Sequence, residues 1–197
     1  MKKIILSLLI VCFFLASLGC QDANKTTGYT GAKQTMTTET VKTAAIDIPL
    51  NKKYKMDEAF ILIKKEAFKV YAVNDEGKVV VAYACALGKN PGQKEREGDM
   101  KTPDGVFVID EIIDASSWTH DFQDGKGEIA GAYGPWFISL DTNNLSKGRW
   151  GGIGIHGTHA PESIGTRVSE GCVRLKNEDI AELKNFAREG MKVVIEE

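Results

Sequence analysis

The segment from residue 155 to residue 174, IHGTHAPESIGTRVSEGCVR, holds the densest group of reactive side chains in the sequence. A cysteine nucleophile needs a base, a group that orients the base, and backbone N–H donors that face the developing oxyanion. Cys172 and His156 are of the required types. Gly157 lets another backbone approach closely, and Gly171 allows the sharp turn that exposes a sulfur. The pattern predicts a thiol enzyme with Cys172 as nucleophile and His156 as base.

Two other interpretations of these residues stay open. Cys172 and Cys85 are the two cysteines away from the N-terminus, so they are candidates for a disulfide. His156, His159 and Cys172 are candidates for a zinc site, although the sequence offers no obvious fourth ligand. Cys85 lies in the apolar run VVVAYACALG, where a free cysteine behaves as a small hydrophobe. The thiol enzyme remains the favoured interpretation.

The elements that must position these residues are mostly strands. Short runs rich in apolar and β-branched residues predict seven of them, at Phe60–Ile63, Phe68–Val73, Lys78–Leu87, Val106–Ile112, Trp136–Leu140, Ile153–His156 and Met191–Ile195. One amphipathic helix is predicted, with Asn177 as N-cap, Gly190 in the left-handed conformation at its end, and a shared apolar face of Ile180, Leu183, Phe186 and Ala187. The fold class is therefore mostly β, a sandwich or barrel with one α-helix on the C-terminal side.

Two long segments carry no regular pattern. Residues 88–105 are polar and glycine-rich, and residues 114–131 contain Trp118, His120 and Phe122. Long irregular excursions within compact domains are often lids or binding loops. We expect the three aromatic residues to cover a substrate groove, with an ordinary surface loop as the alternative.

The N-terminus predicts export. Lys2 and Lys3 precede an apolar run of about 15 residues, which is shorter than the roughly 20 of a membrane-spanning helix. The ending Ser17-Leu18-Gly19-Cys20 resembles the processing box of bacterial lipoproteins, with Ser17 where Leu is usual. We expect a signal peptide at 1–19, a lipidated Cys20 with a flexible tether through 20–45, and one domain at 57–197. An uncleaved anchor and a simple secreted protein are the alternatives.

The composition limits the partners. A hydrophobic fraction of 43% and a charged fraction of 26% are typical of a packed globular protein. A formal net charge of −2 gives no basic footprint, so we expect no nucleic-acid partner. The glycine-rich GGIGIHG lacks the Lys-Ser/Thr of a phosphate loop.

Four blocks together resemble the L,D-transpeptidase catalytic domain (YkuD-like) family. The family pattern is Ile-His-Gly-Thr followed, after about a dozen residues, by Ser-x-Gly-Cys-Val/Ile-Arg. These segments stand here at Ile155–Thr158 and Ser169–Arg174. Lys101–Phe107 resembles the family's Thr-Pro-x-Gly-aromatic turn, and Tyr133–Phe137 resembles the strand entry before the histidine. The resemblance covers most of residues 58–197.

The resemblance implies a β-rich fold, a peptidoglycan substrate and no metal or organic cofactor. It implies that Cys172 attacks the third-residue carbonyl of a tetrapeptide stem, that D-Ala leaves, and that an acceptor amine resolves the thioester. His156 is then base and acid, oriented by the Gly157 carbonyl, and the amides of Gly171 and Cys172 form the oxyanion hole. The implied substrate-binding residues are Ser169, Arg174, Thr158 and Trp118, and for Arg174 a structural salt bridge is the alternative.

One position departs from the family. Many members carry His before the Gly-Cys, where this chain has Glu170, and a carboxylate there is expected to raise the pKa of the Cys172 thiol. The resemblance leaves three functions open. These are a transpeptidase in the cell envelope held by a lipid anchor, a carboxypeptidase or amidase that uses the same Cys-His site, and a non-catalytic peptidoglycan-binding module.

Overall fold

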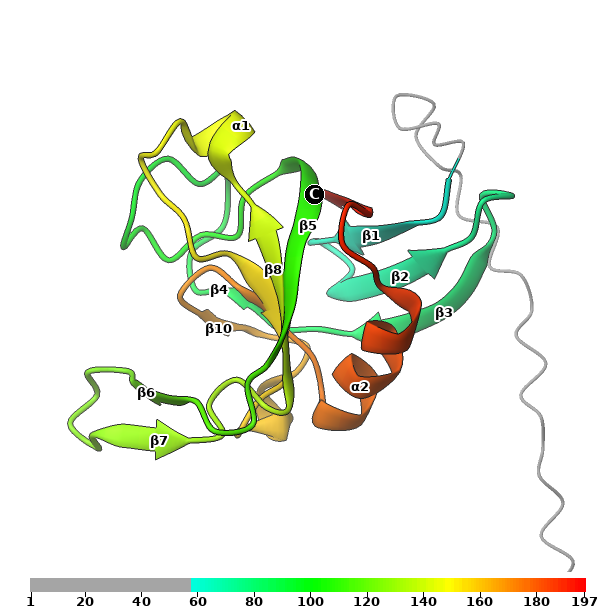
Figure 1. Ribbon diagram of the computed structural model, residues 1–197. Helices are drawn as coiled ribbons and strands as arrows, with labels where there is room; N and C mark the ends of the chain where they lie inside the picture. Colours follow the sequence, from blue (N-terminus) through cyan, green and yellow to red (C-terminus); the bar gives the residue numbers. More distant parts are fainter. Residues whose placement is uncertain (1–57) are drawn as a thin grey trace, which may run out of the picture. The chain divides into compact units, whose positions relative to one another are not determined.

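The computed structural model describes residues 58–197 (Figure 1). The predicted signal peptide, lipidated Cys20 and tether lie outside the described residues. The strands are β1 (Phe60–Lys64), β2 (Lys69–Val73), β3 (Val79–Ala84), β4 (Leu87–Gly88), β5 (Gly105–Asp114), β6 (Thr119–Asp121), β7 (Glu128–Ala130), β8 (Trp136–Asp141), β9 (Gly154–His156), β10 (Arg167–Ser169), β11 (Val173–Arg174) and β12 (Lys192–Glu196). The helices are α1 (Asn143–Ser146), the 3₁₀ turn η2 (Pro161–Ser163) and α2 (Asn177–Phe186).

Eight strands form one curled sheet in the order β11-β9-β8-β5-β12-β1-β2-β3. β1 pairs in parallel with β12, and β11 pairs in parallel with β9, whereas the other neighbours are antiparallel. The long strand β5 crosses the middle of the molecule (Figure 1). Two small sheets, β10-β4 and β6-β7, lie beside this main sheet. The mostly-β prediction is confirmed.

Side chains that alternate along the strands divide the apolar residues between two clusters, because successive strand residues point to opposite faces. In β1, Ile61 and Ile63 join the main core, whereas Phe60 and Leu62 join a smaller cluster on the other face. β12 shows the same alternation: Val193 and Ile195 belong to the main core, and Val194 to the smaller cluster.

The helix α2 packs its apolar side onto the sheet. Ile180 and Leu183 are fully buried and belong to the same core as Ile155 and Val173 of strands β9 and β11. The predicted N-cap is wrong by one residue: Lys176 occupies the cap position and Asn177 begins the helix. The helix also ends at Phe186, so Gly190, which is left-handed as expected, lies in the turn before β12.

The segment 114–131 is not irregular throughout. It contains the hairpin β6-β7, in which His120 pairs with Ile129, and this hairpin projects away from the main sheet (Figure 1). Each strand has three residues, which is too short for a visible alternation in the sequence. Within residues 58–197, no helix combines the length and apolar character that crossing a membrane requires.

Candidate active site

The pairing of three strands places the reactive side chains on one face of the sheet. His156 of β9 lies opposite Phe137 of β8 and beside Arg174 of β11. Cys172 precedes Arg174 by two residues, so both side chains point to the same face as His156. Val173, which lies between them, and its strand partner Ile155 point to the opposite face and belong to the core that α2 covers. The alternation of these short strands therefore separates a reactive face from a packed one.

A cavity of about 670 Å³ lies over the reactive face. Its walls come from β5, β8, the hairpin, the loop before β5 and the Cys172 turn. Of the residues singled out in the sequence, Trp118, His120, Phe122, His156, Ser169, Glu170, Cys172 and Arg174 line it. The structure thus brings the aromatic residues of 114–131, Cys172 and His156 to one pocket. Gly157, Thr158 and Gly171 are not part of its lining.

The imidazole of His156 is buried and held in one tautomer. Its Nδ1 lies 2.7 Å from the carbonyl oxygen of Gly157, the contact that the resemblance implies. Because a carbonyl only accepts, Nδ1 carries the hydrogen and Nε2 keeps its lone pair. Burial, followed by the nearby charge of Arg174, lowers the pKa of His156 to about 3. The ring is therefore neutral at physiological pH and can accept a proton at Nε2.

The Cys172 thiol is also neutral in the free protein. Burial raises its pKa to about 11, although a backbone hydrogen bond from Gly154 and the charges of Arg174 and Lys94 act in the opposite direction. Its Sγ–H donates to the carbonyl oxygen of Gly152 at 3.3 Å. The carboxylate of Glu170 raises this pKa, as predicted, but its contribution is the smallest. Thiol and imidazole therefore rest as an uncharged pair.

Ser169 holds the turn that presents the thiol. Its hydroxyl donates to the carbonyl oxygen of Cys172 at 2.5 Å and accepts the amide hydrogen of Gly171 at 3.1 Å. The side chain is buried, so its polar atom is used inside the turn instead of facing a ligand. The Gly171 amide, assigned to the oxyanion hole by the resemblance, is occupied by this contact in the free protein. Within residues 58–197 the Cys172 amide makes no such hydrogen bond.

A close contact between two backbones fixes the segment after His156. A Cβ built on Gly157 would lie 2.9 Å from the Cα of Gly134 and 2.3 Å from Oδ1 of Asn177, so only glycine fits, as the sequence predicted. That Oδ1 accepts the amide hydrogen of Thr158 at 2.8 Å. Thr158 is buried and its hydroxyl accepts the Ala160 amide hydrogen, so it supports the chain behind the pocket.

Arg174 brings a positive charge to the pocket without a carboxylate partner. Among residues 58–197 it takes part in no ion pair, which contradicts the structural salt bridge considered from the sequence. Its Cζ lies 5.0 Å from the ring centroid of Phe122, and its buried Nε has no hydrogen-bond partner. A buried guanidinium with unused donors is suited to an anionic ligand group.

Polar and aromatic contacts join the hairpin β6-β7 to the turn at residues 169–172, which carries Cys172 and is called the catalytic turn below. His120 Nε2 lies 3.1 Å from a carboxylate oxygen of Glu170, and His120 Nδ1 lies 3.1 Å from the Tyr133 hydroxyl. Tyr133 also packs against His156, with ring centroids 4.9 Å apart. Trp118 packs against Tyr133 and Phe137 in the pocket wall. The hairpin is thus part of the pocket.

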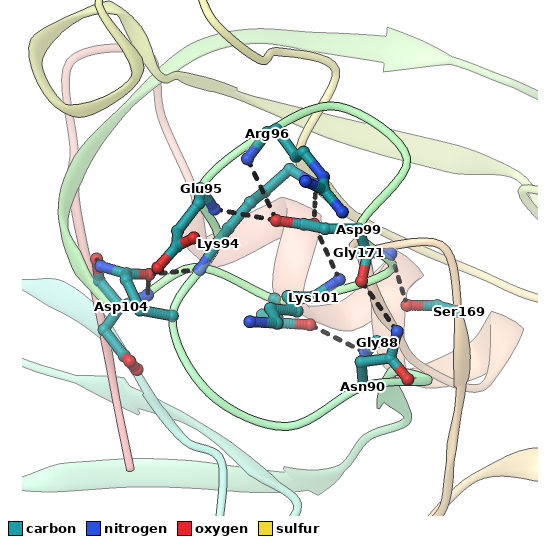
Figure 2. Close-up of polar contacts among 12 residues, drawn as sticks. Gly88, Asn90, Lys94, Glu95, Arg96, Asp99, Lys101, Asp104, Ser169 and Gly171 are labelled. Carbon is teal, nitrogen blue, oxygen red and sulfur yellow. Dashed lines mark hydrogen bonds and ion pairs between the residues drawn. The ribbon is translucent and has the colours of Figure 1, made fainter.

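The polar loop before β5 supports the catalytic turn from the other side. The Asp99 carboxylate accepts hydrogen bonds from the Lys94 ammonium and from the amides of Glu95, Arg96 and Lys101 (Figure 2). Burial alone would raise the pKa of Asp99, but these donors hold it well below its usual range. A Cβ on Gly171 would lie 2.9 Å from the carbonyl oxygen of Lys101, so this ordered loop packs directly against the turn.

The structure also answers the two competing interpretations. Cys85 and Cys172 are free thiols, and Cys85 is a fully buried core residue whose pKa burial raises to about 12. The alternative of a disulfide between them is therefore wrong. In the part of the chain that the structure describes, no three His, Cys, Asp or Glu side chains are grouped so as to hold a metal ion. His159 is exposed and packs against Phe122 instead.

Several residues of the pocket are not identified by the sequence patterns. Tyr133 belongs to a strand entry, Lys94 to a polar loop and Phe137 to a predicted strand, and all three line the cavity. The period-two alternation of β8 could have assigned Phe137 to the face of its partner His156. The other two depend on contacts distant in sequence.

The fold and site define a known class of protein. The catalytic domain of the Enterococcus faecium L,D-transpeptidase has a similar structure, with a TM-score of 0.51 and 22% identity over 72% of this chain and 98% of that domain. Residues 58–195 match the L,D-transpeptidase catalytic domain (YkuD) family. The chain belongs to this family.

Two bacterial relatives show the extent of the similarity. The YkuD protein of Bacillus subtilis (strain 168) is 38% identical over 127 residues, which cover 64% of this chain and 60% of that protein. The YkuD protein of Bacillus licheniformis is 32% identical over 121 residues, which cover 61% of this chain and 56% of that protein. This chain therefore spans less than two thirds of the length of either relative.

Proposed function

We propose that this protein is a peptidoglycan L,D-transpeptidase that works through a thioester on Cys172. The proposal rests on one observation above all: His156 has its Nδ1 hydrogen fixed on Gly157 O, so the Nε2 lone pair is free in the pocket that contains Cys172 and Arg174. A base held in one tautomer in the same pocket as a thiol meets the first requirement of covalent catalysis. Family membership supplies the substrate class.

The first half-reaction acylates the thiol. The sulfur attacks the third-residue carbonyl of a tetrapeptide stem while the thiol proton passes to Nε2 of His156. The amide of Cys172 is available for the oxyanion. The carbon–nitrogen bond then breaks, and the imidazolium returns the proton to the departing D-Ala amine. Arg174 pairs with a carboxylate of the stem, which its unused donors and lack of an acidic partner favour.

The second half-reaction transfers the acyl group. An amine of a second stem attacks the thioester carbonyl, the carbon–sulfur bond breaks, and the thiol re-forms. Thioester aminolysis needs no external energy source, which suits a compartment without ATP. The chemistry requires neither a metal ion nor an organic cofactor.

The test is incubation of the full-length protein with purified disaccharide-tetrapeptides, followed by mass spectrometry. We expect cross-linked dimers together with free D-Ala. Cys172→Ala abolishes both products, whereas Cys85→Ala, which removes the buried core thiol, retains them. Free tripeptide without dimers would show a carboxypeptidase, and an intact fold with no product and no thioester would leave a binding module.

We also propose that the domain acts outside the cytoplasm, tethered by a lipid on Cys20. The support is the sequence Leu18-Gly19-Cys20 after a short apolar run, together with a family whose substrate is the cell wall. Cells fed a clickable fatty acid should label the wild-type protein and not Cys20→Ala. Equal labelling of both would refute the anchor.

A further inference from the structure

Glu170 places a carboxylate in the pocket beside the nucleophile. The residue precedes Cys172 by two positions and lines the same cavity. Its side chain is 39% exposed, so a ligand can reach it. One carboxylate oxygen, Oε2, is bound to His120, and Oε1 forms no hydrogen bond with any residue in 58–197. The carboxylate is therefore held in place with one oxygen still available.

His120 connects that carboxylate to a third group. With its hydrogen on Nε2, the imidazole donates to Glu170, and its Nδ1 accepts the hydroxyl hydrogen of Tyr133 at 3.1 Å. The ring centroids of Phe122 and His120 lie 4.5 Å apart, so the Phe122 ring restricts rotation of the imidazole. The imidazole side chain is 27% exposed, so a proton taken up by the pair can leave to solvent.

The pocket contains one positive and one negative side chain that form no ion pair with each other, Arg174 and Glu170. Arg174 is the cation without a carboxylate partner, whereas the Lys94 ammonium is bound to Asp99 at 2.7 Å. Glu170 is the anion next to the nucleophile, and Glu97 is a second carboxylate, on the opposite loop. An acyl transfer between stems involves a carboxylate on the donor and an ammonium on the acceptor. Arg174 matches the donor carboxylate, and Glu170, which is two residues from Cys172, matches the acceptor ammonium.

We propose that Glu170 and His120 form the subsite that binds the acceptor amine as its ammonium ion and takes its proton. The inference rests on the proposed transpeptidase function and names the recognition of its second substrate. The ammonium gives one proton to the carboxylate–imidazole pair, which releases it to solvent. The free amine forms the carbon–nitrogen bond, the carbon–sulfur bond breaks, and the second amine proton passes through His156 to the sulfur.

The first experiment measures how the thioester partitions between amine and water. The full-length protein is given tetrapeptide donor and an excess of an amine-bearing tripeptide acceptor, and dimers and hydrolysed tripeptide are quantified. Glu170→Gln should lower the dimer-to-tripeptide ratio by about tenfold or more, because a charge-assisted contact to the ammonium is lost. Glu162→Gln, which neutralises an exposed carboxylate outside the cavity lining, should leave the ratio unchanged. Equal effects of both variants, or an unchanged ratio in Glu170→Gln, would overturn the subsite.

The second experiment does not depend on turnover. In the Cys172→Ala background, calorimetry compares the tripeptide that carries a free side-chain amine with the same peptide acetylated at that amine. The free amine should bind about tenfold more tightly or better, and Glu170→Gln should remove this preference. Equal binding of the two peptides would refute the inference even if dimers form. If Cys172→Ala shows this preference but the wild-type protein forms no thioester from the tetrapeptide donor, the transpeptidase is refuted and the ammonium subsite stands.

Discussion

At the scale of single residues, burial decides the protonation states of Cys172 and His156. It is the largest influence on both groups: it raises the pKa of Cys172 to about 11 and lowers that of His156 to about 3. Each shift disfavours the charged form, so the free enzyme holds a thiol and a neutral imidazole. In the proposed mechanism, the thiolate would therefore form as the sulfur attacks, with His156 as general base, instead of being stored in advance as an ion pair.

This neutral state predicts slow alkylation of Cys172 at neutral pH. A thiol with a pKa near 11 has about one molecule in ten thousand ionised at pH 7, against a few per cent for an ordinary cysteine. The rate at which iodoacetamide alkylates Cys172 should keep rising with pH up to about 11. Arg174→Met should move the midpoint upward, because the Arg174 charge lowers this pKa.

Peptide mapping of the alkylated protein identifies the modified cysteine. Cys172→Ala reports any background from Cys85, whose pKa burial raises to about 12. A midpoint at or below the ordinary cysteine value of about 8.5 would show that the thiolate is preformed.

At the scale of elements, the loop before β5 behaves as a folded unit although it has almost no regular structure. The buried Asp99 accepts four hydrogen bonds within it, and the loop then packs against Gly171 of the catalytic turn. The order of the thiol-bearing turn thus depends on a carboxylate outside the pocket lining.

Asp99→Asn should destabilise the domain by about 1–3 kcal/mol near neutral pH, because a buried charged acceptor is replaced by a neutral amide. The folded-state pKa of Asp99 is depressed, so its stabilisation is present above the unfolded value of about 3.9 and is lost as pH falls below it. Urea unfolding should show that the free energy of unfolding of the variant is lower than that of the wild type. This difference should be smaller at pH 3 than at pH 7.

The matched control for this variant is Asp124→Asn, since the Asp124–Lys126 pair is exposed. Its unfolding midpoint should equal that of the wild type at both pH values. If the difference in free energy of unfolding between Asp99→Asn and the wild type is the same at pH 3 as at pH 7, the Asp99 charge does not stabilise the loop.

The sequence was informative wherever a run or a spacing extends along an element. The apolar and β-branched runs in FILIK and KVVIE predicted β1 and β12, and the spacing of Ile180 and Leu183 predicted α2. β10 and β11 have three and two residues, too few for any period to appear. Cys172 and His156 were identified by residue type and by family resemblance. The contacts His120–Glu170 and Lys101–Gly171 join segments distant in the chain, and no local pattern encodes them.

At the scale of the whole molecule, β12 joins two parts of the sheet. It lies between β5 and β1 and pairs with both. Val193, Val194 and Ile195 are fully buried in it and contribute to both apolar clusters. Their burial stabilises the domain by about 5 kcal/mol or more, which is comparable to the total stability of an ordinary domain.

A chain that ends at residue 190 should therefore fail to fold. Circular dichroism and limited proteolysis would show an open, protease-sensitive chain, because β5 and β1 lose their common neighbour. A chain that lacks Glu197 alone is the control: it loses one ion pair of Lys65 and keeps the pair with Asp104. A cooperative thermal transition in the shorter chain would disprove the dependence on β12.

The position of β12 also determines when the protein can begin to fold in a cell. Ile61 pairs with Val193, so the first strand of the domain waits for a partner that the ribosome makes much later. At about 5–20 residues per second, that wait lasts about 7 to 25 s. During it the emerging chain has no complete sheet and stays available to chaperones. A polypeptide that is late to fold is also one that secretion machinery can thread across a membrane before it becomes compact.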